Sequence, residues 1–228
     1  MTSTALEVLT SVLHKGFNVG IAQDSATAAK PETEEGRGVT TKLVGTQSVS
    51  DDSVDAEPSI RNSFVEAFRN HPAGVSIITA TGDDGPAGIT SSSVISISAD
   101  PAVLAFSLQS LRGSASVIAS ARSFVVHLAN SANERLASTF ATRGAVRFGD
   151  DMPWSFLSTG EPFLHGTGHA LRAVPLNATT CGAAVIVTAR VVDVIDPQHM
   201  SAPLVYHNRT YRNLSTHNIS SKEGMSHD

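Results

Sequence analysis

Hydroxyl side chains are concentrated in residues 86–114, PAGITSSSVISISADPAVLAFSLQSLRGS. Four consecutive hydroxyl residues run from Thr90 to Ser93. A second polar group follows at Ser107, Gln109 and Ser110, and then a turn that contains an arginine, Arg112-Gly113-Ser114. Hydroxyls and backbone N–H groups can hydrogen-bond a heterocycle edge or a phosphate without adding much charge. The stretch is therefore typical of a shallow wall for a flat, phosphate-bearing ligand. It also fits the solvent face of an antiparallel sheet.

Two β-strands joined by a tight turn at Asp100-Pro101 are expected to carry these side chains, because residues 103–109 alternate between polar and apolar. Around them, the apolar spacing predicts a helix from Ser59 that ends before Pro72 and buries Ile60, Phe64, Ala67 and Phe68. A strand over 74–80, a helix over 115–120, a strand over 123–128 and a helix over 132–141 follow.

The last third of the chain reads as further strands. Residues 142–165 are loop-like, with Trp154 and Phe156 covering something apolar. Strands over 166–194 are expected to break at Pro175 and Gly182, and residues 204–211 form a final short strand. Many short strands at this spacing favour a barrel or sandwich over a βαβ fold.

Charge and composition divide the chain into three parts. Of the net charge of −5 over 228 residues, all is held by residues 1–58, with nine Asp or Glu against four Lys or Arg. We expect residues 1–58 to be a largely disordered leader with a short helix over 4–15, residues 59–214 to be one domain, and residues 215–228 to be a disordered tail.

The same composition predicts where the protein works and what it does not bind. The neutral body carries no basic stripe for nucleic acid, and no apolar run reaches membrane-spanning length. The single cysteine, Cys181, cannot form an internal disulfide, which predicts a cytoplasmic protein. No G-x-S-x-G motif, metal-ligand spacing or carboxylate pair stands out, so we expect no metal and no dedicated catalytic side chain. An enzyme of this kind would take its chemistry from a cofactor.

Seven segments in order resemble the flavin reductase family of FMN-binding split barrels, the reductase partners of two-component monooxygenases. They are FRNHPAGVSIITA (68–80), GITSSSVISISADPAVLAFSL (88–108), SFVVHL (123–128), ERLASTFA (134–141), RFGDD (147–151), TGEPFLHGT (159–167) and PLVYHNRTY (203–211). The resemblance implies a mainly β fold, a six-stranded Greek-key split β-barrel with a few short flanking helices, assembled as a homodimer. It implies hydride transfer from NADH or NADPH to FMN or FAD, with the reduced flavin passing to a monooxygenase.

The resemblance also implies roles for individual residues. The flavin-binding positions are Gly88, Thr90, Ser91, Ser92, Ser107, Leu108, Gln109, Phe140 and, at the phosphate, Arg112, Gly113 and Ser114. His207 and Tyr211 match the segment that lines the nicotinamide side. Without the family, Ser92 and Ser107 read as strand-face hydroxyls, Phe140 as core and His207 as part of an edge strand.

One departure from the family pattern concerns the nicotinamide side. Where members often have Gly-Asp-His, this chain has Gly182-Ala183-Ala184, so His207 or His127 would have to replace the missing imidazole. A flavin carrier or sensor with little turnover is therefore the second hypothesis. An oxidase or haem-utilisation protein on the same barrel is the third, because fold alone does not decide function.

Overall fold

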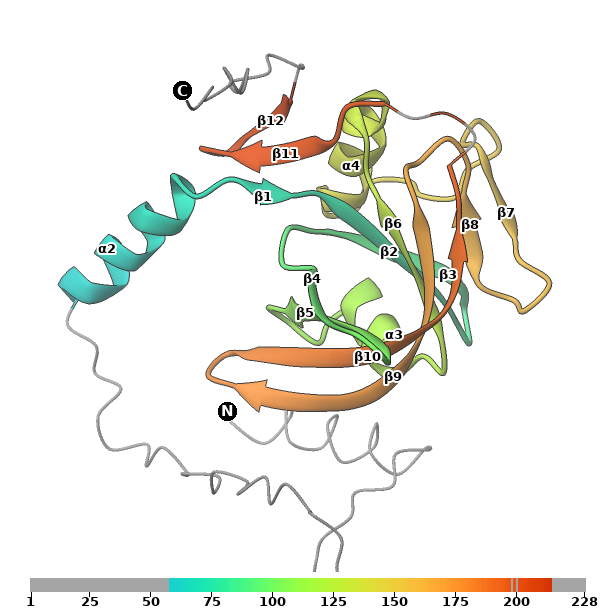
Figure 1. The fold of residues 1–228 in the computed structure, drawn as a ribbon, viewed down its shortest axis with the longest axis horizontal. Coiled ribbons are helices and arrows are strands. Elements are labelled where there is room, and N and C mark those ends of the chain that lie inside the picture. The colour runs from blue at the N-terminus through green and yellow to red at the C-terminus, as the bar shows by residue number, and fades with distance from the viewer. Residues whose placement is uncertain (1–57, 198, 200, 215–228) are drawn as a thin grey trace, which may run out of the picture.

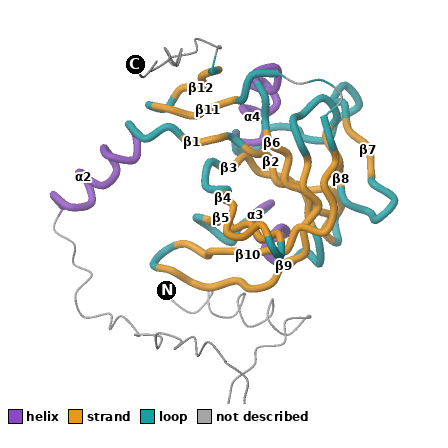
Figure 2. Tube along the Cα trace, viewed as in Figure 1, coloured by secondary structure: helices purple, strands orange, loops and turns teal. Residues whose placement is uncertain are grey.

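The structure, a computed structural model, describes residues 58–197, 199 and 201–214, and this part of the chain is mainly β (Figure 1). Figure 2 shows the strands gathered into one curved body with short helices around it. The mainly β split-barrel prediction is confirmed. Across the described ranges, the helices are all too short or too polar to cross a bilayer.

One seven-stranded antiparallel sheet forms the barrel, in the order β3-β2-β6-β9-β10-β5-β4. Its strands are β2 (Ser76–Gly82), β3 (Gly85–Ser91), β4 (Ile95–Ala99), β5 (Ala102–Leu108), β6 (Phe124–Leu128), β9 (Ala170–Cys181) and β10 (Ala184–Ile195). A three-stranded sheet joins β1 (Ala73–Gly74), β11 (Leu204–His207) and β12 (Thr210–Asn213), and β7 (Trp154–Phe156) pairs with β8 (Pro162–Leu164). The helices are α2 (Pro58–Arg69), α3 (Ser114–Ser120) and α4 (Glu134–Ala141), the last preceded by the 3-10 turn η2 (Ser131–Asn133).

The hydroxyl-rich stretch forms three strands where two were predicted. The chain leaves the sheet after Ser91 and re-enters it at Ile95, so β3 and β4 lie at opposite ends of the strand order. The turn at Asp100-Pro101 joins β4 to β5, as expected. The extra break also explains why the main sheet has seven strands rather than the six of the expectation.

Three other local predictions are corrected. Pro175 does not break its strand, because it lies beside a bulge at Leu176 in the β9–β10 ladder, a position that tolerates a missing N–H. The segment 142–165 contains the β7–β8 hairpin. Residues 204–211 form no single strand: the chain turns back at Asn208 and Arg209, both with positive φ, to make the β11–β12 hairpin.

The barrel interior is the main hydrophobic core. The Phe106 and Phe124 rings meet edge to face inside it, with centroids 5.3 Å apart, and Ile118 of α3 is fully buried against the same cluster. A second cluster lies under α4 and contains Ile77, Phe140 and Leu164. Phe140 therefore belongs to a core while its ring is still close to the strands that carry the hydroxyls.

Helix α2 has the predicted position but not the predicted packing. Ile60, Phe64 and Phe68, expected to be buried, are 63%, 61% and 61% exposed. Figure 1 shows this helix projecting away from the barrel. Its apolar spacing is real, but these three side chains stay largely exposed in the described chain.

His127 is part of the folded framework. Its ring is fully buried, its Nδ1 lies 3.1 Å from the carbonyl oxygen of Ile77, and its Nε2 accepts a hydrogen bond from the Leu164 N–H at 3.0 Å. Burial lowers the pKa of this imidazole to about 4, so the neutral ring joins β2, β6 and β8. The suggestion that His127 replaces the missing nicotinamide histidine is wrong, since backbone groups occupy both ring nitrogens.

Candidate functional site

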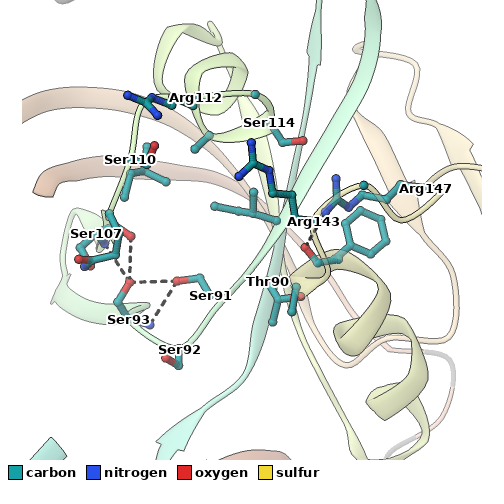
Figure 3. A pocket seen from close by; sticks show the side chains of 18 residues that line it. Thr90, Ser91, Ser92, Ser93, Ser107, Ser110, Arg112, Ser114, Arg143 and Arg147 are labelled. Carbon is teal, nitrogen blue, oxygen red and sulfur yellow. Dashed lines mark hydrogen bonds between the residues drawn. The ribbon is translucent and has the colours of Figure 1, made fainter. Parts of the chain in front are cut away.

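The hydroxyl-rich strands border a cavity of about 740 Å³, which we call the central cavity (Figure 3). Its walls come from β3, the end of β5, the start of α3, and α4 with the loop that follows it. These segments are far apart in the sequence and meet only because the sheet curls. The volume falls in the range typical of small-molecule and cofactor sites.

All but one of the predicted flavin-binding residues line this cavity. They are Thr90, Ser91, Ser92, Ser107, Leu108, Gln109, Arg112, Gly113, Ser114 and Phe140. Gly88 is the exception, since it is buried beneath the wall. A Cβ on Gly88 would lie 2.8 Å from Cδ1 of Phe140 and closer still to Cε1, so the absence of a side chain there lets the Phe140 ring reach the cavity.

Several wall hydroxyls are already bonded within the protein. The Ser91 and Ser93 oxygens are 2.9 Å apart, and Ser93 Oγ accepts from the Ser107 N–H at 2.9 Å. Thr90 Oγ1 donates to the Ala137 carbonyl of α4 at 2.6 Å. The hydroxyls of Ser92, Ser110 and Ser114 have no hydrogen-bond partner within the described chain. The wall therefore combines fixed hydroxyls that hold the strands together with others that can bond a ligand.

Cations gather on another side of the cavity. Arg112, Arg143 and Arg147 line it, and the described lining residues include no Asp or Glu. In Figure 3 their side chains lie apart from the serine cluster of Ser91, Ser93 and Ser107. A cavity lined by both hydroxyls and guanidinium groups fits a ligand with a polar ring and an anionic phosphate.

Sequence reasoning missed Arg143 and Arg147. The Arg147 guanidinium donates to the Thr142 carbonyl at 2.7 Å and the Phe140 carbonyl at 3.2 Å, and its carbon lies 5.9 Å from the Phe140 ring centroid. Its Nε is buried and has no hydrogen-bond partner among the described residues. The segment RGAVRF, just after α4, carries two arginines within five residues and could have predicted this pair of cations.

A second hollow adjoins the central cavity at its hydroxyl end. This hollow, the α2 cleft, has a volume of about 820 Å³ and shares Ser92, Ser93, Ser107 and Gln109 with the central cavity. Arg69, at the end of α2, and Arg209, in the β11–β12 turn, also line it. A ligand in the cavity and a second one in the cleft would therefore meet at the same hydroxyls.

The two predicted nicotinamide residues do not line the central cavity. His207 pairs with Thr210 in the β11–β12 hairpin. Tyr211 lies over α4, where burial, followed by the nearby Tyr206 and Glu134, raises the pKa of its phenol. The Tyr211 ring is 5.2 Å from the ring of Tyr206, and Tyr206 does line the α2 cleft.

The fold and the cavity define a flavin reductase-like split barrel, and residues 68–215 match the family model described as flavin reductase like domain. The chain belongs to this family, which confirms the resemblance found in the sequence.

Known proteins support the same class. The NADH:FMN oxidoreductase of Rhodococcus qingshengii is 35% identical over 148 residues, covering 64% of this chain and 77% of that protein. The flavin reductase domain protein of Arthrobacter sp. FB24 superposes with a TM-score of 0.64 at 30% identity, over 68% of this chain and 96% of that one. The styrene monooxygenase flavin reductase of Pseudomonas putida S12 shares the fold at 22% identity, with a TM-score of 0.59 over 68% and 98% of the two chains.

Proposed function

We propose that this protein is an NAD(P)H:flavin oxidoreductase that reduces FMN or FAD in the central cavity and supplies the reduced flavin to a monooxygenase. The observation that carries the proposal is the union, in one cavity, of hydroxyls from β3 and β5 with the ring of Phe140 and three arginines. The family match and the 35% identical NADH:FMN oxidoreductase support it.

The residues of the cavity fit a flavin mononucleotide in one direction. Arg112 and Arg147 would hold its phosphate, because both line the cavity and guanidinium groups make charge-assisted bonds to phosphate oxygens. Ser92 and Gln109 would bond the polar edge of the ring system. When bound, flavin supplies the hydride acceptor of the reaction.

Hydride transfer requires the nicotinamide and the flavin ring to be held in the correct relative position. No protein nucleophile takes part in it. The chain's contribution is therefore positional. Ser93 holds the wall closed, Phe140 supports one side of the ligand, and the arginines neutralise anionic charge. We accordingly assign no residue as a catalytic acid or base.

The nicotinamide dinucleotide is proposed to approach from the α2 cleft. That cleft meets the cavity at Ser92 and Ser107, next to the expected ring end, and Arg69 and Arg209 could pair with a pyrophosphate. His207 and Tyr211 remain proposed for this side, with Tyr211 acting through its contact with Tyr206.

A second candidate function is a flavin carrier or sensor that turns over slowly. The observation that favours it is the β9–β10 turn, where Gly182 has φ of 58° and the flanking Ala183 and Ala184 offer no imidazole. Both candidate functions use the same flavin site, so they are distinguished only by the rate at which NADH or NADPH is consumed.

Turnover separates the two functions. Purified protein is mixed with NADH or NADPH and FMN or FAD in air, and nicotinamide absorbance is followed against a protein-free blank. Catalytic loss of the absorbance with many turnovers per protein establishes the reductase. Tight flavin binding, with nicotinamide absorbance lost no faster than in the protein-free blank, would instead establish the flavin carrier or sensor.

Assembly as a homodimer belongs to the same proposal. Ile60, Phe64 and Phe68 of α2 expose more than half of their surface, and a second copy would remove them from water. Phe68→Asp should shift the mass measured by light scattering from two chains to one. A monomeric wild-type protein would contradict this part of the proposal.

Two further parts of the proposal concern the chain as a whole. We propose a cytoplasmic location, because its one cysteine, Cys181, is exposed on β9 and cannot form an internal disulfide. The division into a leader over 1–58, a domain over 59–214 and a tail over 215–228 is also proposed, and the helix predicted over 4–15 lies outside the described residues. Limited proteolysis would test that division by leaving a fragment that begins near residue 59.

A further inference from the structure

The central cavity and the α2 cleft together form one cationic surface, which we call the arginine trough. The two hollows are continuous, because they share the hydroxyl-bearing residues at their common border. The described lining residues of both hollows include no Asp or Glu. The cations that line the trough are Arg112, Arg143 and Arg147 in the central cavity and Arg69 and Arg209 in the α2 cleft.

Most of these guanidinium groups have no counter-charge. Among the described residues, only Arg69 of the five makes an ion pair, with its Nη1 2.6 Å from Oε2 of the exposed Glu66. Arg209 is held beside the end of α2, because the neighbouring Asn208 N–H donates to the Arg69 carbonyl at 2.9 Å. A surface that concentrates positive charge in this way attracts anions.

The chain carries an anionic stretch directly before α2. Residues 51–57, DDSVDAE, hold four carboxylates, and the sequence has no Lys or Arg between Lys42 and Arg61. We call these residues the acidic segment. They lie outside the described residues, and the chain that follows them enters α2 at Pro58. The acidic segment is thus tethered to a helix whose own residues line the trough.

The acidic segment is long enough to reach the arginines of the α2 cleft. Helix α2 has 12 residues, so it is about 18 Å long at a rise of about 1.5 Å per residue. Seven residues of extended chain span about 23 Å at about 3.3 Å per residue. Figure 1 shows α2 leading into β1, which pairs with β11 of the hairpin that carries Arg209. The segment can therefore run back along α2 as far as Arg209.

We propose that the acidic segment binds the α2 cleft at Arg69 and Arg209 and competes there with the nicotinamide dinucleotide. This inference depends on the proposed function, in which the same two arginines pair with the pyrophosphate of the dinucleotide. Carboxylates form charge-assisted hydrogen bonds with guanidinium groups, as phosphates do. Tethering gives the segment an effective concentration on the order of millimolar, so even a weak contact occupies the cleft for much of the time.

Removal of three charges from the acidic segment tests the proposal in the full-length protein. Asp51→Asn, Asp52→Asn and Asp55→Asn are combined, and KM and kcat are measured with NADH or NADPH at low salt. We expect KM to fall 2-fold to 5-fold while kcat and the dissociation constant of FMN change by less than 2-fold. The difference from the wild-type protein should disappear in 1 M NaCl, where the Debye length is about 3 Å. Calorimetric titration with the oxidised dinucleotide gives the same comparison without turnover.

A matched variant removes the same number of charges elsewhere in the leader. Glu32→Gln, Glu34→Gln and Glu35→Gln are combined, and this protein should keep the wild-type KM, because these carboxylates lie at least 16 residues farther from α2 than Asp51. A synthetic peptide of residues 51–57 should raise the KM of the Asn variant at millimolar concentration, whereas the same peptide with Asn at 51, 52 and 55 should not.

Arg209→Gln locates the contact. If the acidic segment acts at this arginine, the three Asn substitutions should lower KM in the wild-type background and have less effect in the Arg209→Gln background.

Three outcomes would overturn the inference: an unchanged KM in the Asn variant, an equal fall in the Gln variant, or a full effect of the Asn substitutions in the Arg209→Gln background. A wild-type protein that neither binds flavin nor consumes NADH or NADPH would contradict the proposed function itself, which distinguishes the two failures.

Discussion

The side chain of Ser93 bonds both backbone groups of Ser107. Its oxygen accepts from the Ser107 N–H at 2.9 Å and donates to the Ser107 carbonyl at 3.3 Å. Ser107 belongs to β5, and Ser93 lies two residues before β4, opposite Ser107 in the register that pairs Ile95 with Ala105. The contact therefore extends the β4–β5 pairing by a side chain. This pair of hydrogen bonds closes the hydroxyl wall of the central cavity.

Removal of the Ser93 hydroxyl should therefore open the wall. In Ser93→Ala the half-buried Ser107 N–H loses its partner, which costs about 1–2 kcal/mol of unfolding free energy. We also expect weaker flavin binding. Ser92→Ala is the matched control for stability only, because Ser92 is exposed and makes no side-chain hydrogen bond in the described chain, although it is itself proposed to bond the flavin ring. Urea denaturation and flavin titration measure both effects, and equal stabilities for the two variants would contradict the closure role.

We expect the absence of a side chain at Gly88 to determine where the Phe140 ring lies in the central cavity. The Cβ of Gly88→Ala would overlap the Phe140 ring, and the displacement should cost about 1–3 kcal/mol of stability and reduce flavin affinity. At Gly74 a Cβ would meet nothing within 4 Å, so Gly74→Ala should change neither quantity. Thermal unfolding and flavin titration of both variants provide the comparison. Unchanged flavin affinity in Gly88→Ala would show that the Phe140 position does not matter to the site.

Arg147 should distinguish FMN from riboflavin. A charge-assisted bond to phosphate contributes about 1.5–3 kcal/mol, so Arg147→Ala should weaken FMN binding about 10-fold to 100-fold. Riboflavin, which lacks the phosphate, should lose far less. Arg190→Ala removes an exposed cation of β10 and serves as the control. Equal losses for FMN and riboflavin would mean that Arg147 acts only by holding the end of α4.

His127 should make the folded state sensitive to acid. Burial lowers its pKa to about 4 from a usual 6.5, so the unfolded chain binds this proton more readily than the folded one. The associated stability is complete above pH 6.5 and is lost as the pH falls toward 4. At 1.36 kcal/mol per pKa unit the loss is on the order of 3 kcal/mol.

Denaturation midpoints at several pH values between 7.5 and 4.5 measure this dependence. His127→Gln should flatten the curve in that interval, whatever its stability at pH 7.5. His71→Gln, which replaces an exposed histidine, should leave the curve unchanged. Parallel curves for wild type and His127→Gln would assign the acid sensitivity to other groups.

The class of fold, most element positions and the residues of the hydroxyl wall could be predicted from the amino-acid sequence. Local patterns sufficed for this, because strand alternation, the turn at Asp100-Pro101 and the family motifs are all read within short windows. The short-range pattern also placed α2 correctly, although it could not show that the apolar face of α2 stays largely exposed in the described chain.

The assembly of the site could not be predicted in this way, because it depends on the three-dimensional arrangement of the strands. The His127 ring bonds Ile77 and Leu164, which are distant in the chain, and Arg147 lines the same cavity as the serines of β3 and β5. Both depend on how the strands are arranged in space. A sequence pattern records which residues can form a strand or helix. It does not record how a curved sheet brings distant segments together, and that curvature creates the central cavity and the α2 cleft beside it.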